Sequence, residues 1–62
     1  MCDLKAYVRR QDKEELLLES VNNVLVVNGE VVLRNLFGEE KKIRGRVAEI
    51  SLTRNRVVVE QA

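Results

Sequence analysis

Cys2 is the one thiol of this sequence, and it directly follows the start methionine in "MCDLKAYV". The sequence contains no histidine, so Ser/His and Cys/His nucleophile pairs are excluded. Its three glycines are isolated from one another and form no phosphate-binding loop. One cysteine can neither close a disulfide within the chain nor complete a zinc site by itself. We therefore expect a protein without enzymatic activity of its own.

A thiol at this position can serve a metal site that two chains share. If the chain start lies near a two-fold axis, Cys2 of one chain can meet Cys2 of the other. Backbone nitrogen from the terminal amine and the Cys2 amide would complete the ligand set. Such donors favour a planar arrangement, which suits Ni(II) or Cu(II), and Cu(II) tends to be reduced by thiolates. This reasoning favours Ni(II), and Asp3 is a candidate for a supporting group beside the ion.

Two other interpretations of Cys2 stay open. Free cysteine often acts as a small buried hydrophobe, so Cys2 could be an inert residue at the start of a strand. It could also be an exposed thiol without a role. In both cases the protein would be a purely structural dimer.

Length and charge limit the class of protein further. Sixty-two residues form one small domain, residues 1–62, and a core of this size supplies little stability alone. We therefore expect a homodimer, held by apolar contacts along the first strand. The net charge of +1 gives no general attraction to nucleic acid or anionic membranes. With no apolar run of about 18 residues and no signal-peptide pattern, we expect a cytoplasmic protein that does not bind membranes.

An alternation of apolar and polar residues predicts strands almost throughout. Expected strands cover residues 2–9, 14–20, 21–27, 30–33, 41–52 and 57–60. Asn28 and Gly29 between two apolar runs predict a type I′ hairpin, and Gly45 predicts a bend in the long strand. Leu36 and Phe37 are expected to plug one end of the core. The fold class is all-β, a small SH3-like barrel of five or six short antiparallel strands.

A basic stretch offers an alternative function, an RNA-binding module. Its residues are Lys41, Lys42, Arg44, Arg46, Arg54 and Arg56. A basic stripe on a small barrel can follow a phosphate backbone. Such surfaces usually also carry aromatic side chains for stacking, and this chain has only Tyr7 and Phe37. We therefore favour a solvated sheet face and do not expect nucleic acid as a partner.

Several segments together resemble the CooT-type small nickel-binding proteins. These segments are "MC" at the start, "LKAYV", "EELLLESV", "LFGEEKKIRGRVAEISL" and the closing "RVVVE". The resemblance implies an SH3-like homodimer in which the cysteine after Met1, here Cys2, holds one Ni(II) between two chains. It also implies a nickel chaperone or store for a nickel enzyme such as carbon monoxide dehydrogenase, acting with that enzyme or its maturation factors. Relatives also carry a predicted RNA-binding label, which reflects analogy of fold.

Overall fold

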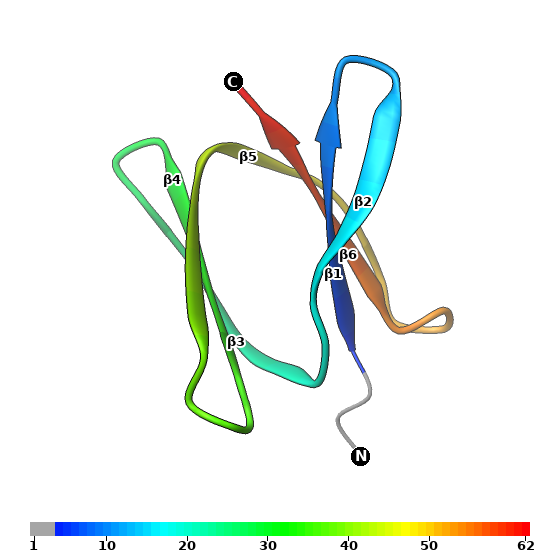
Figure 1. Ribbon diagram of the computed structural model, residues 1–62, viewed down its shortest axis with the longest axis vertical. Helices are drawn as coiled ribbons and strands as arrows, with labels where there is room; N and C mark the ends of the chain where they lie inside the picture. The colour runs from blue at the N-terminus through cyan, green and yellow to red at the C-terminus, as the bar shows by residue number, and fades with distance from the viewer. Residues whose placement is uncertain (1–3) are drawn as a thin grey trace.

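Six strands make up the fold in a computed structural model that describes residues 4–62 (Figure 1). They are β1 (Lys5–Arg10), β2 (Lys13–Leu18), β3 (Val21–Val27), β4 (Glu30–Asn35), β5 (Glu40–Ser51) and β6 (Arg56–Gln61). The prediction of an all-β fold is confirmed. Residues 4–62 include no helix that could cross a membrane.

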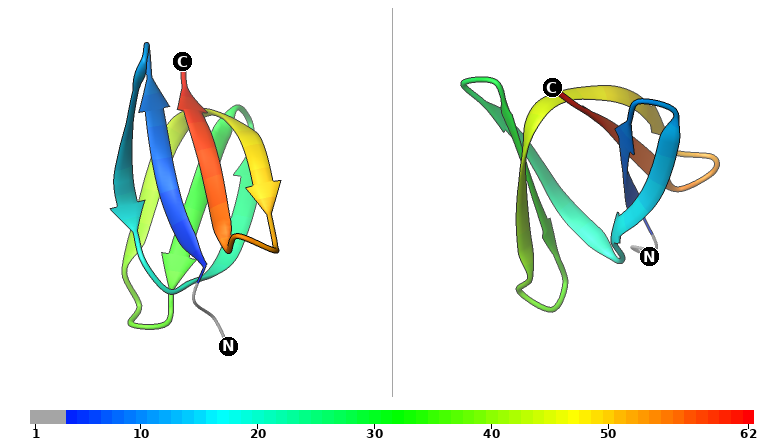
Figure 2. Two further views of the ribbon diagram at one scale, coloured as in Figure 1. Left: turned by 90° about the vertical axis from the view of Figure 1, so that its right-hand side faces the viewer. Right: turned by 45° about the horizontal axis from the view of Figure 1, so that its top comes forward.

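The strands form one strongly bent sheet in the order β2-β1-β6-β5-β4-β3. The long strand β5 pairs with β4 through residues 40–44 and with β6 through residues 45–51, so it belongs to two layers. Figure 2 shows β5 curving over the top of the molecule from one layer to the other. The bend falls at Gly45, as the sequence predicts.

Valine side chains dominate the core between the two layers. Inward-facing residues alternate with outward-facing ones along β1 and β4, as the sequence pattern predicts. The buried cluster consists of Ala6, Leu18, Val21, Val31, Leu33, Val57 and Val59. Leu4, Leu17, Val24, Ile43 and Val47 pack against its margin.

The turns follow local residue chemistry. Asn28 and Gly29 have φ angles of 48° and 77°, so the predicted type I′ hairpin between β3 and β4 is confirmed. The pairing of β3 with β4 is irregular at one point, where the register shifts between Val21 and Asn23. Gln11 also takes a positive φ, of 55°, in the turn between β1 and β2.

Two features differ from a closed antiparallel barrel. β1 and β6 run parallel, with Lys5 opposite Arg56 and Arg9 opposite Glu60. The sheet ends at β2 and β3, which do not pair with each other, so it remains open. Alternation along a strand indicates which residues share a face, but it does not specify the neighbouring strand or its direction.

Candidate metal-binding end of the barrel

Cys2 and Asp3 precede the first described residue, so the predicted metal ligand lies outside the described residues. Leu4 is the first described residue, and two backbone hydrogen bonds hold the peptide unit between Leu4 and Lys5 in place. The Leu4 carbonyl oxygen accepts from the Val21 N–H at 2.8 Å, and the N–H of Lys5 donates to the Asn55 carbonyl oxygen at 2.9 Å. Cys2 is therefore covalently linked to an anchored point, two residues before Leu4.

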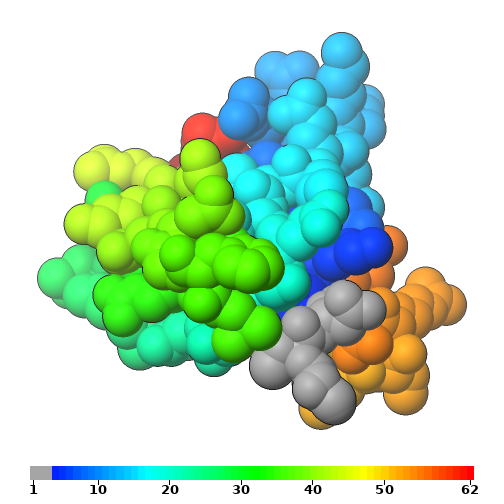
Figure 3. All heavy atoms as spheres, turned by 60° about the horizontal axis from the view of Figure 1, so that its bottom comes forward, coloured from blue at the N-terminus to red at the C-terminus, as the bar shows by residue number. Residues whose placement is uncertain are grey.

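Three turns gather around this point. The N–H of Leu36 donates to the carbonyl oxygen of Ser20 at 3.0 Å, which joins the turn after β4 to the turn before β3. Together with the bonds of Leu4 and Lys5, this places Ser20, Leu36 and Asn55 at one end of the molecule. We call it the Leu4 end: Leu4, residues 19–20, residues 36–38 and residues 52–55. Figure 3 looks onto it, with residues 36–38 in green and residues 52–55 in orange on opposite sides of the blue start of the described chain.

Asn35 fixes the turn formed by residues 36–38. Its side chain is only 3% exposed, and its Oδ1 accepts from the N–H groups of Phe37 at 3.0 Å and Glu39 at 2.9 Å. Its Nδ2 donates to Glu39 Oε1 at 2.7 Å, and its N–H donates to the Glu39 carbonyl oxygen. A buried amide with these partners holds the turn in one conformation. Sequence reasoning did not single out Asn35, although asparagine before a glycine-containing turn is a known signal.

The expectation that Leu36 and Phe37 plug the core is wrong. They are 56% and 76% exposed, respectively. Val31, Leu33 and Asn35 occupy successive inward positions of β4, so Asn35 fills the last inward place at this end. The chain then turns outward, and the turn presents Leu36 and Phe37 to solvent. On the other side of the Leu4 end, Leu52 is 78% exposed.

The described residues offer no alternative metal site. Within residues 4–62, no three cysteine, aspartate or glutamate side chains gather closely enough to hold a metal ion. The carboxylates of Glu14, Glu40 and Glu60 instead form ion pairs with arginines.

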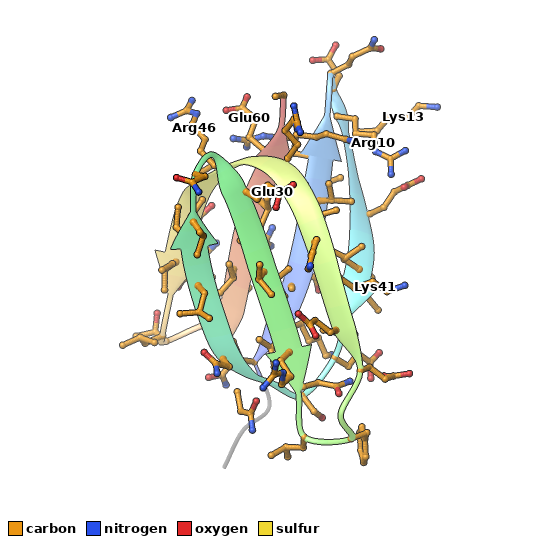
Figure 4. The ribbon with its side chains drawn as sticks, turned by 90° about the vertical axis from the view of Figure 1, so that its left-hand side faces the viewer. Arg10, Lys13, Glu30, Lys41, Arg46 and Glu60 are labelled. Atoms are coloured by element: carbon orange, nitrogen blue, oxygen red, sulfur yellow. The ribbon has the colours of Figure 1, made fainter. Side chains whose placement is uncertain are left out.

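The six basic residues of the alternative function occupy several surfaces. Lys42 and Arg44 lie on the outer face of the β3–β4 layer, opposite Val32 and Glu30 in the register. Lys41 has the opposite orientation along β5 and lines a groove of about 410 Å³ between β2 and residues 35–41. Figure 4 shows Lys41 and Arg46 on opposite sides of the molecule.

Two of the arginines are neutralised by carboxylates. Arg46 Nη2 lies 2.7 Å from Glu60 Oε1 across the β5–β6 pair. Arg56 pairs with Glu14, and its guanidinium lies over the ring of Tyr7, 4.7 Å from the centroid. Arg54 lies in the turn of residues 52–55. Tyr7 therefore contacts a cation on the sheet surface instead of standing free for stacking on a base.

The protein is a small all-β domain with an open six-stranded sheet, and the one thiol of its sequence lies at position 2. Comparison with known proteins identifies the family. The chain matches the family of the CO dehydrogenase accessory protein CooT over residues 1–60. It therefore belongs to that family. The fold is similar to a crystal structure assigned as CooT from Carboxydothermus hydrogenoformans, with a TM-score of 0.86 and 31% sequence identity, covering 98% of each chain. Among curated proteins, none matches this chain significantly.

Proposed function

We propose that this chain is a nickel-binding accessory protein that stores Ni(II) or delivers it to a nickel enzyme, with CO dehydrogenase as the principal client. One ion is held between two chains by Cys2 of each. The observation that carries the proposal is the position of the one thiol, two residues before an anchored Leu4, in a chain of the CooT family. Nickel is the cargo, and the chain performs no reaction on it.

The ligand chemistry supports Ni(II) over other ions. Thiolate is a soft donor, and the chain start supplies backbone nitrogen from the terminal amine and the Cys2 amide. Adjacent chelate rings from these donors favour a square plane, which Ni(II) accepts and Zn(II) disfavours. Cytoplasmic conditions would keep the thiol reduced and available as a ligand.

Metal titration of the purified protein tests the proposal. We expect saturation at about one Ni(II) per two chains, as a site on a two-fold axis requires. Cys2→Ser should abolish tight binding, because a hydroxyl does not replace the thiolate. Lys42→Gln is the control: it changes an exposed residue opposite Val32, on the outer face of the β3–β4 layer, and should leave the stoichiometry unchanged. Tight nickel binding by Cys2→Ser would falsify the proposal.

A further inference from the structure

The two edge strands of the sheet differ in how they are protected against pairing with another chain. β2 carries Lys13, Glu14 and Glu15, whereas β3, with the sequence VNNVLVV, has no charged residue and no proline. Edge strands usually carry such residues, because a bare edge presents unpaired N–H and C=O groups to any other strand. Within residues 4–62, the edge of β3 that faces away from β4 makes one backbone hydrogen bond, from the Val21 N–H to Leu4. The rest of this edge is open to a further strand.

Apolar side chains are exposed on both faces of β3. Leu25 lies opposite Val32, which faces outward, and Val26 lies opposite Val31, which faces the core. Because residues directly opposite share a face, Leu25 points outward and Val26 inward. Leu25 is 51% exposed and Val26 62%, since no strand follows β3 in the sheet, and the outward residue Val27 is 50% exposed. Figure 4 looks onto this layer, with β3 at its margin.

This arrangement determines what can cover the edge. A helix or a flat protein surface would contact Leu25 and Val27 on the outer face and leave Val26 uncovered. A further strand places alternate side chains on both faces and also bonds to the free backbone groups. The segment that fits is therefore extended, and it is apolar and uncharged beside Leu25 and Val26, because β3 supplies no charged partner for a buried charge.

We infer that an extended apolar segment of the nickel-receiving protein adds to the free edge of β3 as a further strand. The inference rests on the proposed function in naming the partner, because a chain that delivers nickel has to dock on the protein that accepts it.

The position of β3 suits this role, because the strand starts at the metal-binding end. Its first residue, Val21, bonds to Leu4. A rise of about 3.3 Å per residue puts Val24 roughly 10 Å along the strand from Val21. A segment paired with residues 24–27 therefore holds its protein beside the Leu4 end.

Binding to purified nickel-free CO dehydrogenase tests the inference, with the affinity measured by surface plasmon resonance. Leu25→Lys and Val26→Lys place a charge on the outer and the inner face of the edge, and each should raise the dissociation constant about tenfold or more. Leu16→Lys is the matched control: Leu16 is 49% exposed but lies on β2, the other edge strand. It should leave the dissociation constant unchanged. All three positions are exposed, so thermal unfolding of each variant should stay close to that of the parent.

Hydrogen exchange in the complex tests strand pairing itself. Backbone amides of residues 22–27 that point to the free edge should exchange more slowly in the complex, whereas those of β2 should not change. A partner that covers only the outer face would be weakened by Leu25→Lys alone and would leave these amides unprotected. That result, or no binding of CO dehydrogenase at all, overturns the inference.

A second copy of this chain is the competing occupant of the edge, and sedimentation of the chain alone distinguishes it. Leu25→Lys should leave the oligomeric state unchanged. If this variant dissociates an oligomer that the parent forms, another copy occupies the edge and the inference is overturned.

The two proposals can fail separately, because nickel uptake is measured without the partner. A chain that binds CO dehydrogenase through β3 but takes up no nickel supports the docking site and overturns the proposed nickel function. Nickel uptake by a chain whose complex neither β3 variant weakens overturns the docking site and leaves nickel binding standing.

Discussion

Gly45 lies directly against the backbone of Glu60: a Cβ at Gly45 would lie 2.0 Å from the Glu60 carbonyl oxygen. This contact occurs where β5 passes from one layer to the other. Two backbone hydrogen bonds hold the strand at this bend. The Ala62 N–H donates to the Arg44 carbonyl oxygen, and the Gly45 N–H donates to the Gly29 carbonyl oxygen. The bend therefore depends on the absence of a side chain at residue 45.

Gly45→Ala should lower the free energy of unfolding by about 2 kcal/mol or more, since a methyl group there must displace backbone atoms. Chemical denaturation measures the change. Gly38→Ala is the control: Gly38 has a φ of 84° but no atom within 4 Å of its Cβ direction. It should cost about 1 kcal/mol, through backbone conformation alone. Equal losses in the two variants would contradict the close-contact explanation.

Asn35→Ala should destabilise the protein by about 1–3 kcal/mol, because it leaves the N–H groups of Phe37 and Glu39 without their acceptor. Urea denaturation measures the change. Asn23→Ala, at an exposed position of β3, is the control and should leave the free energy of unfolding unchanged. An Asn35→Ala protein as stable as the parent would show that these two hydrogen bonds contribute little.

Nickel affinity should fall as the pH falls, because protons compete with the metal for thiolate and backbone nitrogen. Competition with a chelator at several pH values measures this dependence. Bound Ni(II) should be diamagnetic and show thiolate charge-transfer absorption, as square-planar ligation implies. A short extension before Met1 should weaken binding sharply if the terminal amine is a ligand, and should have little effect if the thiolate and the Cys2 amide suffice. Affinity that does not vary with pH would exclude this ligand set.

RNA binding should be weak and should decrease steeply as salt rises, because the basic residues are dispersed and two of them are paired. Lys42→Gln and Arg44→Gln should weaken it further without changing nickel uptake. Fluorescence anisotropy with random RNA at two salt concentrations provides the measurement. Sequence-specific binding that survives moderate salt, in a protein that takes up no nickel, would favour the RNA-binding module instead.

Local chemistry made much of the fold predictable. Asn28 and Gly29 specify a turn with positive φ at both positions, and the alternation in β1 places Ala6 and Val8 in the core. Gly45 identifies the bend because a glycine inside a strand indicates a close backbone approach. Each of these features depends on a few neighbouring residues, which is why sequence patterns reveal them.

Features that depend on distant residues were not predictable. The apolar side chain of Phe37 predicts a place in the core, but its exposure follows from Asn35, which takes the last inward position of β4. The parallel pairing of β1 with β6 joins opposite ends of the described chain, and no local pattern encodes it. For the proposed metal site, Cys2 remains a prediction from the sequence, and the structure adds the anchored Leu4 and the turns around it.

Because β1 pairs with β6, the fold has a consequence during translation. Contacts such as Ala6 with Val57 close a loop of about fifty residues, so they form late and only after β6 has been synthesised. The hydrogen bond from Lys5 to Asn55 depends on the same late segment. A nascent chain that stops before β6 therefore lacks both the parallel partner of β1 and the hydrogen bond from Lys5 to Asn55. The start of β1 is fully paired only in chains translated through β6.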